Sequence, residues 1–189
     1  MLGKLQHQKI ERLFNVLDSN KDALLEAADF SQVAERLAQV RNVDTTSVVY
    51  EKILAMQMGW WEGIRQGADK DSDGQITLDE WNTFWAAWLD SVVDEIGSGQ
   101  SPALDAIKAS ASSTFDVIDT NGDGQITPTE YADWCKAMSL NIDAQATFER
   151  LDVSQVGKMS RDQTVERIKE YFLTNDPEAP GNHIYGPLN

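Results

Sequence analysis

The sequence has few features that would cross-link the chain or send it to a membrane. Its 189 residues include one cysteine, Cys135, which excludes an internal disulfide and fits a reducing compartment. No stretch approaches the roughly 20 apolar residues of a membrane span, and the opening MLGKLQHQKIERLF lacks the apolar run of a secretory signal. We therefore expect a soluble, cytoplasmic protein without stable membrane insertion.

Basic residues are scarce. Sixteen lysines and arginines stand against 31 aspartates and glutamates, which gives a formal net charge of -15. This excess disfavours nucleic acid and anionic membranes as partners, and it favours metal cations or basic segments of other proteins. A GxxxxGK[ST] phosphate loop is missing, and no serine, histidine and aspartate stand in a suggestive context, so we expect no enzymatic activity.

Much of the acidity is concentrated in two twelve-residue stretches, DKDSDGQITLDE (69–80, loop 2) and DTNGDGQITPTE (119–130, loop 3). Both match D-x-[DN]-x-[DN]-G-x5-E, in which oxygen ligands at alternate positions surround a Ca²⁺ ion and a central glycine makes the sharp turn. Position 7 offers its backbone carbonyl, position 9 a hydroxyl or a bridging water, and position 12 both carboxylate oxygens. The predicted ligands are Asp69, Asp71, Asp73, Gln75, Thr77 and Glu80 in loop 2, and Asp119, Asn121, Asp123, Gln125, Thr127 and Glu130 in loop 3.

A weaker copy, DSNKDALLEAAD (18–29, loop 1), predicts a third site. Ala23 replaces the turn glycine, which costs roughly 1 kcal/mol if a left-handed conformation is needed there. Asp29 is one methylene shorter than the usual glutamate, and its shorter reach favours a smaller, six-coordinate ion, so Mg²⁺ can compete with Ca²⁺. The predicted ligands are Asp18, Asn20, Asp22, the Leu24 carbonyl, Glu26 and Asp29.

A fourth copy, DVSQVGKMSRDQ (152–163, loop 4), keeps Asp152, Ser154 and Gly157. Val156 and Gln163 stand where carboxylates belong, so we expect no useful Ca²⁺ binding at this loop. Its predicted role is structural, as the partner that loop 3 needs to bury its apolar surface.

Apolar residues at three- to four-residue spacing flank each loop and predict an incoming and an outgoing helix around it. The expected fold is all-α: four EF-hands in two packed pairs, with short β contacts between paired loops through Leu25, Ile76, Ile126 and Met159. The expected units are an amino-terminal pair at 1–97, a linker at 98–102, a carboxy-terminal pair at 103–175 and a tail at 176–189 packed on the body. Loop starts lie 51, 50 and 33 residues apart, which predicts long outgoing helices, or long connections after them, in the first two hands.

With these features the sequence resembles the sarcoplasmic calcium-binding proteins of the EF-hand superfamily, most closely the calexcitin branch. The resemblance rests on the unequal spacing of the hands, Asp29 closing loop 1, the segment GWWEGIRQGADKDSDGQITLDEWNTFWAAW, the defective loop 4 and the ending EYFLTNDPEAPGNHIYGPL. It implies a compact helical protein whose first three loops carry ions and whose tail packs on the body. It also implies a role as a Ca²⁺ and Mg²⁺ buffer or as a carrier of calcium signals, and it does not distinguish between these two roles.

Two other functions remain open from the sequence. A sensor would open a methionine-rich groove for a helical target, but the chain has five methionines and six tryptophans, which favours a permanently packed aromatic core. An ion channel is a further partner that only the resemblance to calexcitins implies. A carrier of an apolar small molecule, like coelenterazine-binding proteins and photoproteins, shares the four-hand layout. Only His7 and His183 are available for the histidine-lined cavity of photoproteins, and both lie near the termini. We expect a monomer with Ca²⁺ as its main partner.

Overall fold

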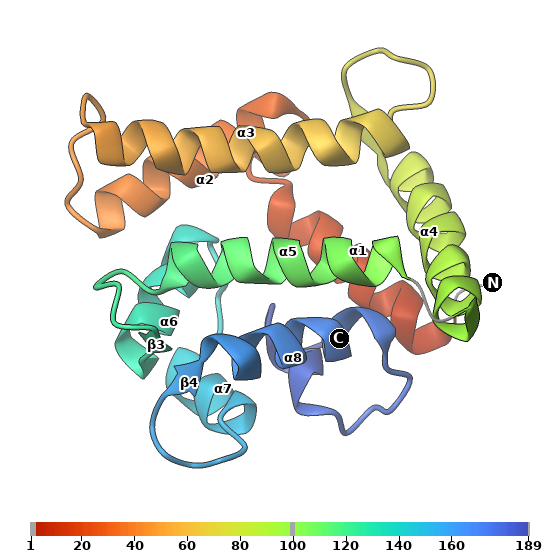
Figure 1. Cartoon of the computed structure of the whole chain (residues 1–189). Coiled ribbons are helices and arrows are strands. Elements are labelled where there is room, and N and C mark those ends of the chain that lie inside the picture. The colour runs from red at the N-terminus through yellow and green to blue at the C-terminus, as the bar shows by residue number, and fades with distance from the viewer. Residues whose placement is uncertain (1–2, 99–100, 189) are drawn as a thin grey trace.

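The structure, a computed structural model, describes residues 3–98 and 101–188 and is helical over most of this length (Figure 1). Its helices are α1 (Lys4–Leu17), α2 (Ala27–Val40), α3 (Val48–Ala68), α4 (Leu78–Ser98), α5 (Pro102–Ile118), α6 (Pro128–Ala137), α7 (Ala144–Leu151), α8 (Arg161–Leu173) and the 3₁₀ turn η1 (Pro180–His183). The strands are β1 (Leu24–Leu25), β2 (Ile76–Thr77), β3 (Gln125–Ile126) and β4 (Met159–Ser160). The all-α prediction with short strand contacts is confirmed.

Each loop sits between two helices, and its own residues begin the second one. In loop 3 the Thr127 side chain accepts the Glu130 N–H at 3.3 Å, while the Glu130 carboxylate accepts the Thr127 N–H at 2.9 Å. Ser160 and Gln163 make the same reciprocal pair at the start of α8. Such capping boxes satisfy N–H groups that a helix start leaves unpaired, so positions 9 and 12 of a loop also fix where its outgoing helix begins.

The strands join the loops two by two. β1 pairs antiparallel with β2, with Leu25 opposite Ile76, and β3 pairs antiparallel with β4, with Ile126 opposite Met159. These four side chains are at most 1% exposed, so each loop pair has one buried pair of apolar side chains between its two strands. Loop 1 is therefore joined to loop 2, and loop 3 to loop 4.

The long intervals after loops 1 and 2 are filled in two different ways. α4 is long, at 21 residues, but α2 has only 14. Most of the extra length after loop 1 lies in α3, the incoming helix of the second hand, which also has 21 residues. The predicted linker at 98–102 includes residues 99 and 100, which lie outside the described residues; Pro102 begins α5, with Ser101 as its N-cap.

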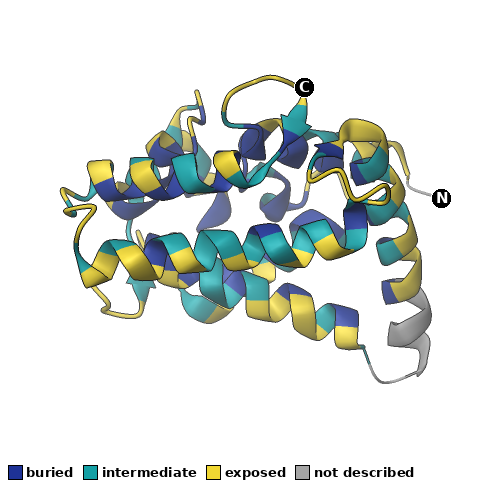
Figure 2. Ribbon diagram, turned by 90° about the horizontal axis from the view of Figure 1, so that it is seen from above, coloured by how far each residue is buried: buried dark blue, intermediate teal, exposed yellow. Residues whose placement is uncertain are grey.

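Aromatic rings connect the two halves of the core. Trp85 of α4 stacks on Phe172 of α8 with ring centroids 5.0 Å apart and an interplanar angle of 9°. Trp81 is fully buried and donates its indole N–H to the Ile10 carbonyl of α1 at 2.9 Å. Buried residues accordingly lie on the inward faces of the helices, while the outward faces are exposed (Figure 2). The two halves thus share one core.

The described tail residues lie against that core. Ile184 and Tyr185 are each 1% exposed. The Ile184 carbonyl accepts the Tyr131 hydroxyl at 3.0 Å, and the Tyr185 carbonyl accepts Nε of Arg12 at 2.9 Å. At Gly181 an added Cβ would come within 2.2 Å of the Arg167 carbonyl, so this glycine is what lets the tail approach α8 so closely.

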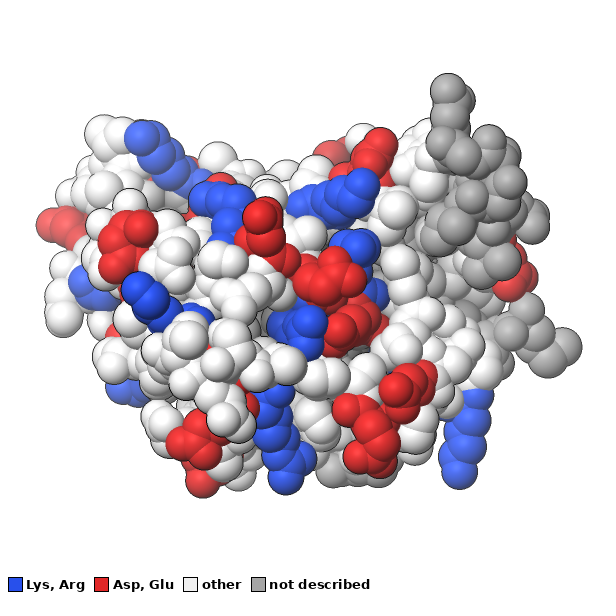
Figure 3. Space-filling model, turned by 60° about the horizontal axis from the view of Figure 1, so that its bottom comes forward, with Lys and Arg blue, Asp and Glu red and all other residues white. Residues whose placement is uncertain are grey.

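The outer surface mixes charges of both signs on the face that Figure 3 shows, where lysine and arginine side chains are interspersed with aspartates and glutamates. On α8, Arg167 pairs with Glu170 at 3.0 Å and Lys169 with Glu166 at 2.8 Å. Over the described ranges, 3–98 and 101–188, none of the helices is long and apolar enough to cross a membrane.

Candidate metal sites

The four loops share one backbone conformation. Position 4 is left-handed in every loop, at Lys21, Ser72, Gly122 and Gln155, and so is position 6, at Ala23, Gly74, Gly124 and Gly157. Ala23 adopts φ 68°, close to the 79–85° of Gly74 and Gly124, although a Cβ makes this region costly by roughly 1–2 kcal/mol. Loop 1 therefore has the complete loop geometry despite its missing glycine.

Loop 2 brings three carboxylates together. Asp69, Asp71 and Asp73 each offer an oxygen, and these atoms all lie within 4.8 Å of one another. The Asp69 side chain is 1% exposed. Its Oδ2 accepts the Gly74 N–H at 3.2 Å and lies 3.9 Å from the Arg65 guanidinium, but its Oδ1 is buried and has no hydrogen-bond partner among the described residues. A buried carboxylate oxygen without a donor is costly unless a cation approaches it. The donor set, all hard oxygens, fits Ca²⁺.

Glu80 closes loop 2 at position 12. Its Oε1 accepts the Lys70 N–H at 3.1 Å, and its Oε2 accepts the Thr77 N–H at 2.9 Å and the Thr77 hydroxyl at 2.8 Å. These donors, the Thr77 backbone first, hold the pKa of Glu80 below its ordinary value. The carboxylate thus stays charged and ties the second residue of the loop to the ninth.

Loop 3 repeats the arrangement with one carboxylate fewer. Asp119 accepts the N–H groups of Gly122 at 2.9 Å and Gly124 at 3.0 Å, while the amide of Asn121 donates to Asp123 at 3.2 Å. Glu130 is 6% exposed; burial opposes its ionisation, but hydrogen bonds from Thr127, Thr120 and Asn121 outweigh burial and lower its pKa. The neutral Asn121 leaves this loop with less repulsion to relieve than loop 2.

Loop 1 is the most enclosed of the three. Asp18 is 3% exposed and accepts the N–H groups of Lys21 at 2.7 Å and Ala23 at 3.0 Å. Asp29 is fully buried and accepts the N–H groups of Ser19 and Glu26, each at 2.9 Å. The short Asp29 therefore closes this loop through the same second and ninth positions that Glu80 joins in loop 2.

The remaining predicted ligands of loop 1 are divided between two environments. Asn20 and Asp22 are exposed and bonded to each other, with Asn20 Nδ2 and Asp22 Oδ2 2.7 Å apart. The Glu26 side chain instead contacts loop 2, where it accepts Nε2 of Gln75 at 2.5 Å. The three predicted carbonyl ligands lie at the strands: Leu24 begins β1, Gln125 begins β3, and Gln75 directly precedes β2.

Lys21 is a residue that the motif does not single out. Its ammonium donates to the Asp18 carbonyl at 2.6 Å and also to the Asn15 carbonyl, at the end of α1. Burial lowers its pKa, and nearby Asp18 and Asp29 partly oppose that shift. A cation thus already lies near the loop 1 carboxylates. Its sequence signal is a lysine at position 4, where loops 2, 3 and 4 have serine, glycine and glutamine.

In loop 4 the inward-facing polar atoms are paired by hydrogen bonds within the loop. Both oxygens of Asp152 have donors, the Ser154 hydroxyl at 2.7 Å and the Gly157 N–H at 2.7 Å. The Gln163 amide donates to the Ser154 hydroxyl at 3.0 Å and accepts the Ser160 N–H at 2.8 Å. A chain of neutral donors therefore stands where the other loops gather carboxylates.

Comparison with known proteins identifies these loops. A model of the EF hand matches residues 67–85 and 112–135, which enclose loops 2 and 3. The chain is 25% identical to sarcoplasmic calcium-binding proteins I, III and IV of Branchiostoma lanceolatum over 190 aligned residues, 98% of each chain. The chain is an EF-hand calcium-binding protein. Calexcitin-1 of Caenorhabditis elegans is another homologue, 23% identical over 96% of this chain and 86% of the relative.

Solved structures show the same fold. This EF-hand protein superposes on a sarcoplasmic calcium-binding protein from amphioxus with a TM-score of 0.74 at 22% identity, covering 99% of both chains. It superposes on the Ca-loaded apo form of coelenterazine-binding protein from Renilla muelleri with a TM-score of 0.73 at 18% identity, covering 99% of this chain and 100% of that one. The homologues named above are calcium-binding proteins and not enzymes.

Proposed function

We propose that this EF-hand protein is a cytoplasmic, monomeric calcium buffer that holds three ions, in loops 1, 2 and 3, while loop 4 stays empty. The observation that carries the proposal is the unpartnered, buried Oδ1 of Asp69 amid three converging carboxylates. Loop 3 is supported by its complete ligand spacing, and loop 1 by its left-handed Ala23 and its buried Asp18 and Asp29. The proposed ligands are those that the loop spacing predicts.

A buffering role is supported by the shared core. A sensor must expose an apolar groove when it binds Ca²⁺, but here rings such as Trp85 and Phe172 hold the two halves together. The paired loops 1 and 2, the paired loops 3 and 4 and the docked tail are proposed to act as one body. The short Asp29 supports the further proposal that Mg²⁺ competes at loop 1.

Calorimetric titration with Ca²⁺ at physiological Mg²⁺, with an apolar surface dye recorded on the same samples, tests this function. The expected result is three binding events with little change in dye signal. Three divalent ions would change the formal net charge from -15 to -9, and an ion at 100 times its Kd adds about 2.7 kcal/mol of stability. Fewer than two ions bound at micromolar free Ca²⁺ contradicts the buffer; a large rise in dye signal indicates a sensor instead.

A second function, carriage of an apolar small molecule, is favoured by a cavity of about 280 Å³ between α1, α3, α4, α5 and α8. The indole N–H of Trp85, in its wall, is buried and finds no hydrogen-bond partner within residues 3–98 and 101–188. Gly59 and Gly63 of α3 are exposed at its edge, and an added Cβ at either would meet nothing within 4 Å. The aromatic residues of its lining are Trp60, Trp81, Phe84, Trp85, Trp88 and Phe172.

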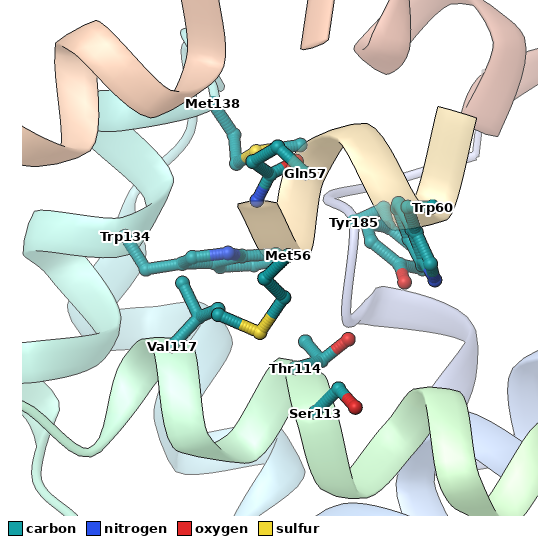
Figure 4. Close-up of a pocket in the computed structure, with 9 residues that line it drawn as sticks. All are labelled: Met56, Gln57, Trp60, Ser113, Thr114, Val117, Trp134, Met138 and Tyr185. Carbon is teal, nitrogen blue, oxygen red and sulfur yellow. The ribbon is translucent and has the colours of Figure 1, made fainter. Parts of the chain in front are cut away.

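Trp60 separates this cavity from a smaller one. Its indole N–H donates to the Ser110 hydroxyl of α5 at 2.7 Å. On its other side, a pocket of about 30 Å³ has room for about two water molecules, and Met56 of α3 extends across it toward α5 (Figure 4). Trp60 and Trp88 are thus half-buried, whereas Trp61, Trp81 and Trp85 are buried. Trp81 and Trp85 belong to the core and also line the larger cavity.

The carrier function is tested with the neutral aromatic dye N-phenyl-1-naphthylamine. Binding in the cavity should quench tryptophan fluorescence with a one-to-one endpoint, and Gly63→Leu, which places a side chain at the open edge, should abolish the quenching. Val153→Leu, at an exposed site in loop 4, is the control and should bind the dye as the wild type does. Absence of quenching in the wild type, or equal quenching in Gly63→Leu, rules the carrier function out.

A further inference from the structure

The side chains of Glu26 and Gln75 join loop 1 to loop 2 directly. Gln75 Nε2 donates to Glu26 Oε1 at 2.5 Å. The strand register explains the meeting: Leu24 lies opposite Thr77 and Leu25 opposite Ile76, so the next rung places Glu26 opposite Gln75. Glu26 is position 9 of its loop and Gln75 is position 7 of the other. Each is therefore a residue of one metal loop that contacts the other loop.

Among the described residues, the carboxy-terminal pair shows no such contact, although its register is the same. Gln125 lies opposite Ser160, again position 7 against position 9. Ser160 uses its hydroxyl to accept the Gln163 N–H at 3.3 Å, and within the described part of the chain no hydrogen bond of the Gln125 side chain is found. The cross-loop bond is thus a property of the residue pair Gln75 and Glu26, not of the strand pairing alone.

We propose that the Gln75–Glu26 bond couples the two amino-terminal sites, so that an ion in loop 2 raises the affinity of loop 1, and that Gln75 is the positioning residue. The inference rests on the proposed function, because it needs ions at both loops. The Gln75 carbonyl is the position 7 ligand of loop 2, so ion binding there fixes the Gln75 backbone. Its side-chain amide then holds Glu26 in place for loop 1.

The energetic reason is the ordering of Glu26. A free glutamate loses rotamer freedom when it binds an ion, and a partner that has already immobilised it removes part of this loss. A carboxylate has two oxygens, so Glu26 can keep Gln75 on Oε1 and offer Oε2 to a cation or its bound water. Gln75 is also a neutral donor, so it orders Glu26 without adding to the repulsion among the loop carboxylates.

The coupling can be measured site by site by nuclear magnetic resonance in calcium-buffered samples of the full chain. The amides of Gly74, Ala23 and Gly124 report on loops 2, 1 and 3, because each donates to the first aspartate of its own loop. Loop 2 is disabled by Asp71→Ala with Asp73→Ala, both exposed. Coupling is the ratio of the loop 1 Kd with loop 2 disabled to the loop 1 Kd with loop 2 intact.

We expect a ratio of about fivefold or more in the wild type and a ratio near one in Gln75→Leu. Gln125→Leu, the matched change in the other pair, should keep the wild-type ratio. The exchange Glu26→Gln with Gln75→Glu reverses donor and acceptor and should restore the coupling, whereas Gln75→Glu alone should lose it. A purely structural role for Gln75 would change both Kd values by the same factor and leave the ratio unchanged.

Two results would overturn the inference in distinguishable ways. If loops 1 and 2 both bind Ca²⁺ but Gln75→Leu keeps the wild-type ratio, the coupling proposal is wrong and the buffer function stands. If the Ala23 amide does not respond to Ca²⁺ at any concentration while that of Gly74 does, loop 1 is not a site and the three-ion function fails with it.

Discussion

Loops 2 and 4 have the same backbone and opposite interiors. Their fourth and sixth residues are left-handed in both, at Ser72 and Gly74 and at Gln155 and Gly157. In loop 2, Asp69 is left with a buried oxygen that nothing in the described chain satisfies; in loop 4, both oxygens of Asp152 have donors 2.7 Å away. The same loop shape therefore accommodates both interiors. Ion binding depends on whether the side chains leave unsatisfied negative charge inside that shape.

The largest expected effect on Ca²⁺ binding comes from giving loop 2 the residue type that loop 4 has at position 12. Glu80→Gln keeps the size of the side chain and the carbonyl oxygen that accepts the Thr77 N–H, as Gln163 does with Ser160. We expect the affinity of loop 2 for Ca²⁺ to fall by about 100-fold or more, because position 12 loses the carboxylate that is proposed to bind the ion with both oxygens. The Gly74 amide measures this loss.

The fold should survive this change, with the ion-free free energy of unfolding altered by less than about 1 kcal/mol, because the cap hydrogen bonds remain possible. The Gly124 amide serves as internal control and should titrate as in the wild type. A fall of less than tenfold at loop 2 would show that Glu80 is not a direct ligand.

The reverse change should create a site. Val156→Asp with Gln163→Glu gives loop 4 the carboxylates that it lacks at positions 5 and 12, and Val156 is 62% exposed, so the core is not disturbed. We expect the ion-free protein to lose stability from the added repulsion, and Ca²⁺ at 100 times the new Kd to return about 2.7 kcal/mol. Calorimetry should show one more ion bound than in the wild type.

Val156→Asp alone is the control for this gain. It adds charge but leaves the Gln163–Ser154 bond in place, and it should bind no additional ion. An extra ion bound by this single variant, or none bound by the double variant, would show that positions 5 and 12 do not decide the difference between the loops.

Much of this organisation could be predicted because it is local in sequence. Ligands at alternate positions, a turn residue at position 6 and caps at positions 9 and 12 lie within twelve residues, so a motif describes them completely. Even Ala23 adopts the left-handed turn conformation, with φ 68°, although it carries a Cβ. The length of α3 could not be predicted in this way. The spacing between loops 1 and 2 shows how many residues separate them, but it does not show whether α2 or α3 contains the additional residues.

The features that were not predicted depend on tertiary distances. The bond between Gln75 and Glu26 joins residues 49 positions apart and requires the antiparallel register of their two loops. The sequence predicts a contact through Leu25 and Ile76, but it does not show that the side chains of the next residue pair meet. The cavity beside Trp60 depends on how closely α3 approaches α5, and no local pattern of aromatics distinguishes a cavity wall from a packed core.

A smaller effect, on the ion-free stability, is expected at position 6, where loop 1 has alanine and loop 2 has glycine. Ala23→Gly should raise the ion-free stability by about 0.5–1 kcal/mol, because the strain of a left-handed alanine exceeds the added entropy of a glycine in the unfolded chain. Gly74→Ala is the reciprocal variant; its Cβ would meet nothing within 4 Å, so only the backbone is tested. It should lose a similar amount in urea unfolding. Equal stability of all three proteins would contradict the strain assigned to Ala23.

The smallest expected effect distinguishes position 4 of loop 1 from that of loop 2. Lys21 places its ammonium against the Asp18 carbonyl at 2.6 Å, where loop 2 has the uncharged Ser72. Lys21→Gln should strengthen Ca²⁺ binding at loop 1 by about three- to fivefold, since a nearby unit charge at the surface opposes the ion by on the order of 1 kcal/mol. The same change should cost about 0.3–1 kcal/mol of ion-free stability, because Lys21 also complements the carboxyl end of α1. A rise in Ca²⁺ affinity together with a fall in ion-free stability distinguishes this electrostatic role from general damage to the loop, which would lower both quantities. Lys70→Gln, at the exposed second position of loop 2, is the control for the loss of a positive charge alone.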